Sequence, residues 1–135
     1  TPAGKGEEDS LFASLRRGAC YGTCPVYEIR IYKSGFVRYQ GTLHVAILGR
    51  DSARIGRQVM DSLAAFAQRI GYFDLKEVYK SPVSDFPATV TYLNAGEKKK
   101  KVRNENYQPP ASLGAFERFF DGLFESKGWA KKGKP

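Results

Sequence analysis

The two cysteines of the chain lie in one short segment, Cys20-Tyr-Gly-Thr-Cys24, which is followed by Pro25. A disulfide here would close a ring of about five residues and contribute roughly 2 kcal/mol through chain entropy, before strain is subtracted. A pair of reduced structural thiols is the second interpretation. A redox or metal site is the third, but thioredoxin-type motifs separate their cysteines by two residues and zinc needs three or four ligands. We favour the disulfide, which would indicate an oxidising compartment.

His44 is the only histidine, so Ser-His-Asp or Cys-His catalysis would have to use it. We expect His44 on a strand that begins after Gly41, as a partly exposed polar residue. The sequence has no phosphate-binding glycine loop, no HExxH motif and no paired-cysteine zinc pattern. We therefore expect no catalytic residues, no metal and no cofactor, and we favour a protein that is not an enzyme.

Asp85 lies in the segment Ser81-Pro-Val-Ser-Asp-Phe-Pro87. An aspartate in such a segment commonly accepts backbone N–H groups and holds a turn, and we favour this structural role. The functional hypothesis is a ligand cleft lined by Asp85, Tyr27, Tyr79 and the cysteine turn.

The basic excess comes from two parts of the chain. There are 22 Lys and Arg against 14 Asp and Glu, a net charge of +8. Removing Lys98–Lys101 and four lysines from Lys127 onward leaves 14 basic and 14 acidic residues. We favour a solvated edge strand for Lys98, Lys99, Lys100 and Lys101, followed by Arg103. The alternative is an anion-binding surface for nucleic acid, anionic lipid or an envelope polymer.

These residues must be positioned by a chain of 135 residues, a length typical of one domain. We expect a flexible leader over residues 1–9, a single domain over 10–126 and a basic flexible tail over 127–135. No apolar run reaches the roughly 18 residues of a membrane-spanning helix, so we expect no transmembrane segment.

Alternating and helical periodicities predict the secondary structure of the domain. The predicted strands are residues 10–17, 26–32, 36–40 with an extension or bulge over 41–48, 88–93 and 97–103. One predicted helix covers residues 53–70, with Asp51 or Ser52 as its cap and Gly71 as its end. A second helix follows a Ser112 cap and ends at Gly128. Residues 72–87 are expected to form a long loop with a short helical turn over 75–79.

The expected order is therefore β-ββ-α-ββ-α. This order favours an α+β fold, in which an antiparallel sheet of four or five strands carries two amphipathic helices on one face.

The cysteine segment also resembles a known family. Cys20-Tyr-Gly-Thr-Cys-Pro-Val-Tyr27, then the Ser34-Gly35 turn and Val37, Tyr39 and Gly41, resembles the bacterial domain of unknown function family 6438. Its pattern is Cys-aromatic-Gly-x-Cys-Pro-x-Tyr, then a strand and Val-x-Tyr-x-Gly. The resemblance extends to Tyr72-Phe73, Tyr79 and Asp85-x-Pro87, and so covers residues 10–125. Ala88 stands where the family usually has threonine.

The resemblance implies an exported or lipid-anchored bacterial protein whose signal has been removed, and it supports the disulfide. It implies no activity. Our leading hypothesis is a non-enzymatic binding module of the cell envelope, periplasmic or secreted, whose partner is an envelope protein or an anionic polymer. The first alternative is a cytosolic nucleic-acid-binding protein that uses Lys98–Lys101 and the tail. The second is a thiol redox protein that uses Cys20 and Cys24.

Overall fold

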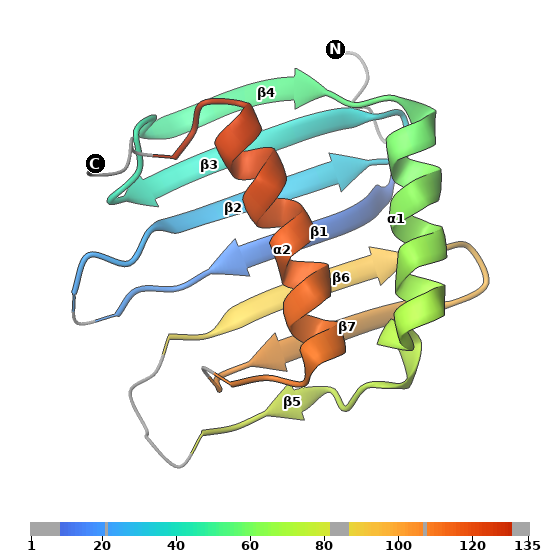
Figure 1. The fold of residues 1–135 in the computed structure, drawn as a ribbon. Helices are drawn as coiled ribbons and strands as arrows, with labels where there is room; N and C mark the ends of the chain where they lie inside the picture. The colour runs from blue at the N-terminus through green and yellow to red at the C-terminus, as the bar shows by residue number, and fades with distance from the viewer. Residues whose placement is uncertain (1–8, 21, 82–86, 107, 131–135) are drawn as a thin grey trace.

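The computed structural model describes residues 9–20, 22–81, 87–106 and 108–130. The fold is α+β, with a seven-stranded sheet of order β4-β3-β2-β1-β6-β7-β5 (Figure 1). Neighbouring strands are antiparallel except for the parallel pair β5 and β7. The strands are β1 (Leu11–Arg17), β2 (Val26–Tyr32), β3 (Phe36–Leu43), β4 (Gly49–Arg54), β5 (Val78–Tyr79), β6 (Thr89–Asn94) and β7 (Lys99–Asn104).

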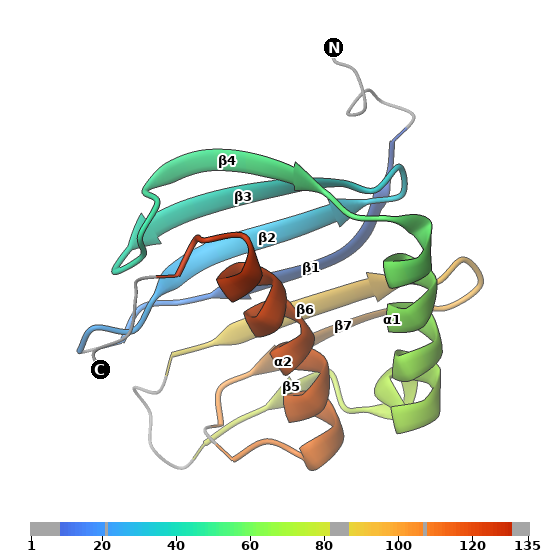
Figure 2. The same cartoon turned by 45° about the horizontal axis from the view of Figure 1, so that its top comes forward.

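Two helices cover the same face of this sheet, as both ribbon views show (Figures 1 and 2). Helix α1 is Arg57–Ile70 and helix α2 is Ala111–Ser126, and a short 3-10 helix, η1 (Tyr72–Asp74), follows α1. Gly71 ends α1 in the left-handed region with φ of 77°, as its position after the last apolar residue predicts.

The core lies between the sheet and the helices because strand residues alternate between the two faces. In β2, Tyr27, Ile29 and Ile31 are buried, whereas Glu28 and Arg30 point away from the helices. Three aromatic pairs stack between the layers at centroid distances of 3.9 to 4.3 Å. These pairs are Tyr27–Phe124, Tyr39–Trp129 and Tyr72–Phe116.

The predicted class and the two helices are confirmed, but the predicted count of four or five strands is wrong. Strand β4 was missed because its sequence, Gly-Arg-Asp-Ser-Ala-Arg, has no apolar alternation and is mostly exposed. Its conformation depends on antiparallel pairing with β3. Asp51 and Ser52 lie within β4, so neither caps a helix. Gly56 is the N-cap of α1 instead, without a side-chain hydrogen bond.

The strand position predicted for His44 is also wrong, although the residue is partly exposed as expected. Strand β3 ends at Leu43, and His44 lies in the following turn with φ of +57°. This turn folds back on Gly41, where an added Cβ would lie within 2.3 Å of the Ile47 carbonyl oxygen. A side chain at position 41 would therefore force the turn away from the sheet.

Three further boundaries differ from prediction. The helical turn expected over residues 75–79 is η1, at Tyr72–Asp74, and β5 follows it with two residues paired to β7. A two-residue strand such as β5 has no detectable period, so only its pairing with β7 reveals it. Ser112 does not cap α2, because the helix already begins at Ala111 after Pro110.

The packed body of the domain continues past the end of α2. Trp129 is 1% exposed, stacks on Tyr39 and donates its indole N–H to Asp51 at 2.8 Å. The Ala46 N–H also bonds the Trp129 carbonyl oxygen. Trp129 lies in the segment that the sequence assigned to the tail, and it attaches the end of α2 to β4 and to the turn before it.

Candidate functional site

Cys20 and Cys24 form a disulfide whose Cα atoms are 5.8 Å apart. It closes the connection between β1 and β2, and both cysteines are half-buried. The N–H of Gly22 bonds the Cys20 sulfur at 3.3 Å. Because both thiols are used in the bond, nucleophilic thiol chemistry would require prior reduction.

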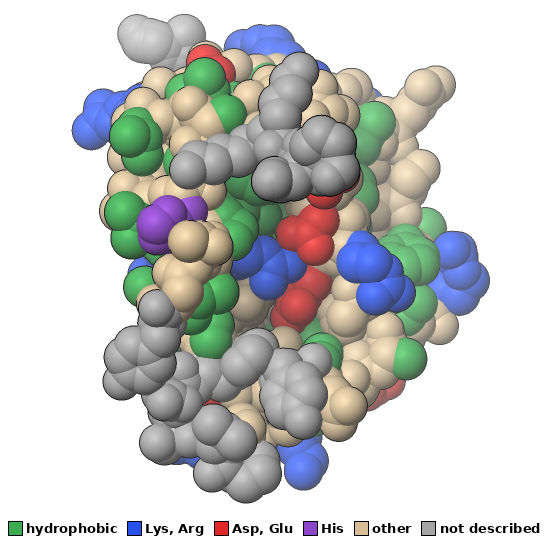
Figure 3. All heavy atoms as spheres, turned by 60° about the vertical axis from the view of Figure 1, so that its left-hand side comes forward, with side chains coloured by type: hydrophobic (Ala, Val, Ile, Leu, Met, Phe, Trp, Pro, Cys, Tyr) green, Lys and Arg blue, Asp and Glu red, His purple; other side chains and the backbone are tan. Residues whose placement is uncertain are grey.

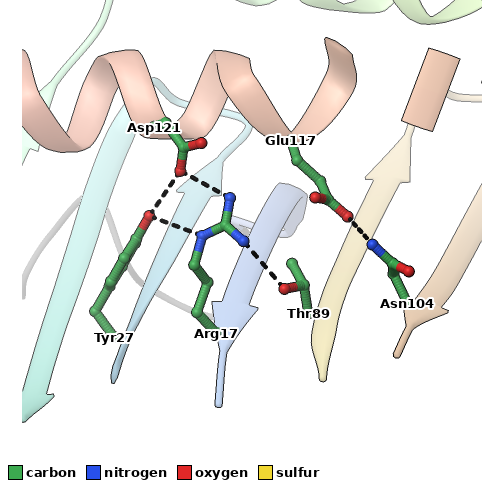
Figure 4. A network of polar contacts seen from close by, with 6 residues as sticks. All are labelled: Arg17, Tyr27, Thr89, Asn104, Glu117 and Asp121. Atoms are coloured by element: carbon green, nitrogen blue, oxygen red, sulfur yellow. Dashed lines mark hydrogen bonds and ion pairs between the residues drawn. The ribbon is translucent and has the colours of Figure 1, made fainter. Parts of the chain in front are cut away.

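Beside this turn, a polar network joins three strands to α2 (Figure 4). The guanidinium of Arg17 bonds Asp121 Oδ1 at 2.8 Å and Thr89 Oγ1 at 3.1 Å. The Tyr27 hydroxyl donates to Asp121 Oδ1 at 3.2 Å and accepts from Arg17 Nε at 3.4 Å. The space-filling view in Figure 3 shows a basic side chain next to acidic side chains, with hydrophobic side chains on one side of them.

The environment fixes the charge states of this network. Burial raises the pKa of the Tyr27 hydroxyl well above its ordinary value, so the phenol keeps the proton that it donates to Asp121. Burial alone would lower the pKa of Arg17, but Asp121 and Tyr27 outweigh it and the pKa rises. The network is therefore an ion pair with a neutral phenol bridging it.

Glu117 lies one helical turn before Asp121 on α2 and is 7% exposed. Its Oε2 accepts the Asn104 side-chain N–H at 3.0 Å, and burial raises the pKa of its carboxyl group. Two carboxylates at this spacing could serve acid-base chemistry. Here Asp121 is bonded to Arg17 and Tyr27, and Glu117 to Asn104, so both hold α2 on the sheet.

The predicted cleft residues lie far apart in the sheet. Tyr27 is in β2 and Tyr79 in β5, with strands β1, β6 and β7 between them. Tyr79 is half-buried, and its hydroxyl accepts the Lys76 N–H at 2.9 Å. Asp85 lies outside the described residues. The described structure therefore does not bring Tyr27 and Tyr79 into one cleft.

The predicted anion-binding residues lie on or beside β7. Lys98 precedes the strand, with its ammonium 5.7 Å from the Phe73 ring centroid. Lys100 lies opposite the buried Leu93, on the helix side, and Lys101 lies opposite Tyr92 on the other side. Strand β5 pairs only with the last two residues of β7, Arg103 and Asn104. In the described chain, Lys99, Lys100 and Lys101 therefore lie on the part of β7 whose outer edge is not paired with β5.

The sheet face opposite the helices, here called the uncovered face, carries most of the basic strand residues. Strand alternation and register place eight cations there: one each from β1, β2 and β3, two from β4 and three from β7. They are Arg16, Arg30, Arg38, Arg50, Arg54, Lys99, Lys101 and Arg103. Glu28 is the only carboxylate at a strand position on this face in the described part of the chain.

Most of this charge is uncompensated. Arg30 pairs with Glu28 and Arg103 with Glu105, and the Arg54 guanidinium lies over the Phe36 ring. The other five cations make no ion pair or ring contact with any residue that the structure describes. Arg30 and Arg38 lie directly opposite each other, an arrangement of like charges that destabilises a sheet.

The uncovered face is hollowed at the end nearest the cysteine turn. The hollow has a volume of about 350 Å³, and side chains of five neighbouring strands line it. Its lining includes the basic residues Arg16 and Arg103, the polar residues Glu28 and Gln40, and the apolar Val90. This composition suits a polar, anionic ligand group.

Counting charges along the chain does not reveal the uncovered face, because a count does not place the charges on the strands. Once the eight clustered lysines are set aside, acidic and basic residues are equal in number, but Asp61, Glu117, Asp121 and Glu125 lie on the helices. The alternation in β1, β2 and β3 could have predicted this face, because it places Arg16, Arg30 and Arg38 on the side of the sheet away from the core residues.

The fold and these sites define a small α+β domain with a disulfide-closed turn, a helix-covered face and a basic uncovered face. The chain belongs to the family described as Domain of unknown function (DUF6438), whose profile matches residues 12–124. This match confirms the resemblance inferred from the cysteine segment. A search of curated proteins finds no match to the chain.

Among the described residues, no group of three or more His, Cys, Asp or Glu side chains is arranged to hold a metal ion. In the same part of the chain, no helix is both long and apolar enough to cross a membrane.

Proposed function

We propose that this domain is a non-enzymatic binding module of the cell envelope, which binds a linear anionic polymer across its uncovered face. The segregation of charge carries the proposal: among the described residues, eight cations and one carboxylate occupy the strand positions of one face. Natural surfaces usually intersperse charges of both signs, so a field of one sign indicates attraction of an oppositely charged partner.

The arrangement of the cations favours an extended partner. Arg16, Arg30 and Arg38 occupy adjacent strands in the centre of the sheet, with β4 and β7 adding cations on both sides. Strands lie about 4.8 Å apart, so this series forms a track across the sheet. Arginine also suits phosphate and carboxylate groups, because its planar guanidinium donates two parallel hydrogen bonds.

The disulfide supports the cell-envelope part of the proposal, because such bonds persist in oxidising compartments. Native protein should show no thiol that reacts with an alkylating reagent before reduction, and both cysteines should react afterwards. Two reactive thiols in protein prepared without reductant would contradict export.

Titration with long-chain polyphosphate, followed by fluorescence anisotropy at several salt concentrations, tests the binding part. We expect saturable binding whose logarithm of affinity falls steeply with the logarithm of salt concentration. The double variant Arg16→Gln/Arg38→Gln should reduce that slope by about two, roughly one for each arginine that no longer pairs with a phosphate. Arg69→Gln/Arg118→Gln, which removes the same charge from the helix layer, is the matched control. Equal reductions in both double variants would reject a specific face.

A nucleic-acid ligand is the second candidate function, and the position of Tyr92 favours it. Tyr92 is half-buried and lies opposite Lys101 on the uncovered face. An aromatic ring beside cations can stack on a base while the phosphates are neutralised. Single-stranded DNA should then bind at least tenfold tighter than polyphosphate of equal charge, and an abasic strand should lose that preference. Equal affinities for the three would reject base recognition.

A further inference from the structure

A groove lies between α1 and α2, on the side of the sheet opposite the uncovered face. Its volume is about 610 Å³, and we call it the α1–α2 groove. The two helices make little contact with each other, because each packs separately on the sheet. Leu63, Phe66 and Phe119 give the groove an apolar lining. A site of this size with an apolar lining is typical of small-molecule binding.

The groove exists because α1 has more apolar surface than the sheet covers. Met60, Leu63 and Ala67 are its buried residues and face the core. Val59, however, is 40% exposed, and Phe66 is only half-buried, although both continue the apolar stripe on the side toward α2. All these residues recur at helical spacing along α1. In the structure, Met60, Leu63 and Ala67 are buried against the core, whereas Val59 and Phe66 stay partly exposed beside α2.

The charged groups of the groove are both cationic. Arg69 and Arg118 are exposed lining residues, and the Arg69 guanidinium lies 5.4 Å from the Phe66 ring centroid. The described lining includes no aspartate or glutamate. No ion pair joins either arginine to a carboxylate of the described chain. Both guanidinium groups can therefore pair with the anionic group of a ligand whose apolar part lies in the groove.

We propose that the α1–α2 groove binds an amphiphile that has an acyl chain and a single carboxylate. The chain contacts Leu63, Phe66 and Phe119, and the carboxylate pairs with Arg69 and Arg118. Charge complementarity selects this ligand class, because a neutral amphiphile would leave both guanidinium groups without an anion. The proposal concerns a different surface from the polymer site and does not depend on it.

Calorimetric titration with decanoate and with the neutral probe decanol tests the groove. We expect saturable binding of one decanoate, with decanol binding at least tenfold more weakly. The variant Arg69→Gln/Arg118→Gln should weaken decanoate about tenfold or more and leave decanol unchanged. Arg57→Gln, at the start of α1 and outside the groove lining, is the matched control and should bind decanoate like the original chain.

A second variant places the ligand in the groove. Ser62 is exposed and lines the groove, so Ser62→Phe should fill it and abolish binding of both probes while the helical circular dichroism stays unchanged. Absence of saturable decanoate binding to the original chain would overturn the proposal. Equal affinity for the two probes would also overturn it. Binding of an acidic amphipathic helical peptide without decanoate binding would assign the groove to a protein partner instead.

Discussion

The two faces of the sheet consist of alternate residues of the same strands, yet their side chains have opposite chemistry. On the helix side, Tyr27, Ile29 and Ile31 of β2 are buried in the core, and Tyr27 stacks on Phe124 of α2. On the uncovered face, Glu28 and Arg30 of the same strand lie among further arginines. Because alternation is a property of the backbone, one short sequence serves both purposes.

We expect the helix side of the sheet to determine stability and the uncovered face to determine binding. The helix side has stacked rings, a bridged ion pair and the buried Trp129, so substitutions there should change the free energy of unfolding. The uncovered face has uncompensated cations and a pair of opposed arginines, so substitutions there should change binding and leave stability nearly unchanged.

The largest decrease in stability is expected from Phe116→Ala. Phe116 is fully buried, stacks on Tyr72 at 4.1 Å and meets Phe120 edge to face. Truncation should lower the free energy of unfolding by about 3–5 kcal/mol, because less apolar surface is buried and a cavity is left behind. Urea denaturation measures this. A decrease below about 1 kcal/mol would show that α2 does not depend on this side chain.

A smaller decrease is expected from Arg17→Met, which removes the cation that bridges the sheet and α2. The side chains of Arg17 and Asp121 are 22% and 38% exposed, so water screens the pair. We expect destabilisation of about 1–2 kcal/mol, less than for a fully buried pair.

A double-mutant cycle with Asp121→Asn tests the coupling. If the two destabilisations simply add, the residues are not coupled, and the network does not fasten α2 as we describe.

The pH dependence of stability should reveal Glu117. Burial raises its folded-state pKa above the unfolded value, so folding favours the protonated carboxyl group. This contribution to stability is complete below the unfolded pKa and is lost as pH rises through the folded pKa. Glu117→Gln should therefore gain stability relative to the original chain as pH rises from about 4 to 7. A constant difference across that range would contradict the shift.

The smallest stability effect is expected from Arg38→Gln on the uncovered face. This change removes one of two opposed like charges, so we expect stability to stay within about 0.5 kcal/mol of the original or to rise slightly. Thermal unfolding at low salt measures it, with Ser52→Ala as a neutral control on the neighbouring strand. A decrease above about 1 kcal/mol would mean that Arg38 has a structural role.

Sequence periodicity predicted the parts of the fold that bury a regular stripe. Val26–Tyr32 alternates clearly, and Leu113, Phe116 and Phe120 mark α2, so both elements were found. Strand β4 has no such pattern, because β3 supplies its pairing and Trp129 bonds its Asp51. The short β5 depends in the same way on β7. Elements defined by distant partners leave little local signal.

The candidate sites follow the same division. The cysteine pair was predictable because four residues of spacing limit its geometry, and the disulfide is present. The basic run was visible because Lys98–Lys101 are consecutive. The uncovered face was not predicted because Arg16, Arg38 and Arg103 are far apart in sequence and come onto one face only through the strand order and register, with β2 and β6 between their strands. The Arg17–Asp121 pair spans more than a hundred residues, so no local pattern could reveal it.

The most direct test of the account follows arginine side-chain Nε–H signals by NMR during addition of polyphosphate. If the uncovered face is the binding surface, the signals of Arg16, Arg30 and Arg38 should shift together and saturate. Those of Arg69 and Arg118 on the helix layer should stay unchanged. Shifts confined to Arg69 and Arg118, or no saturable shift of any arginine, would contradict the central claim that the uncovered face binds the anionic polymer.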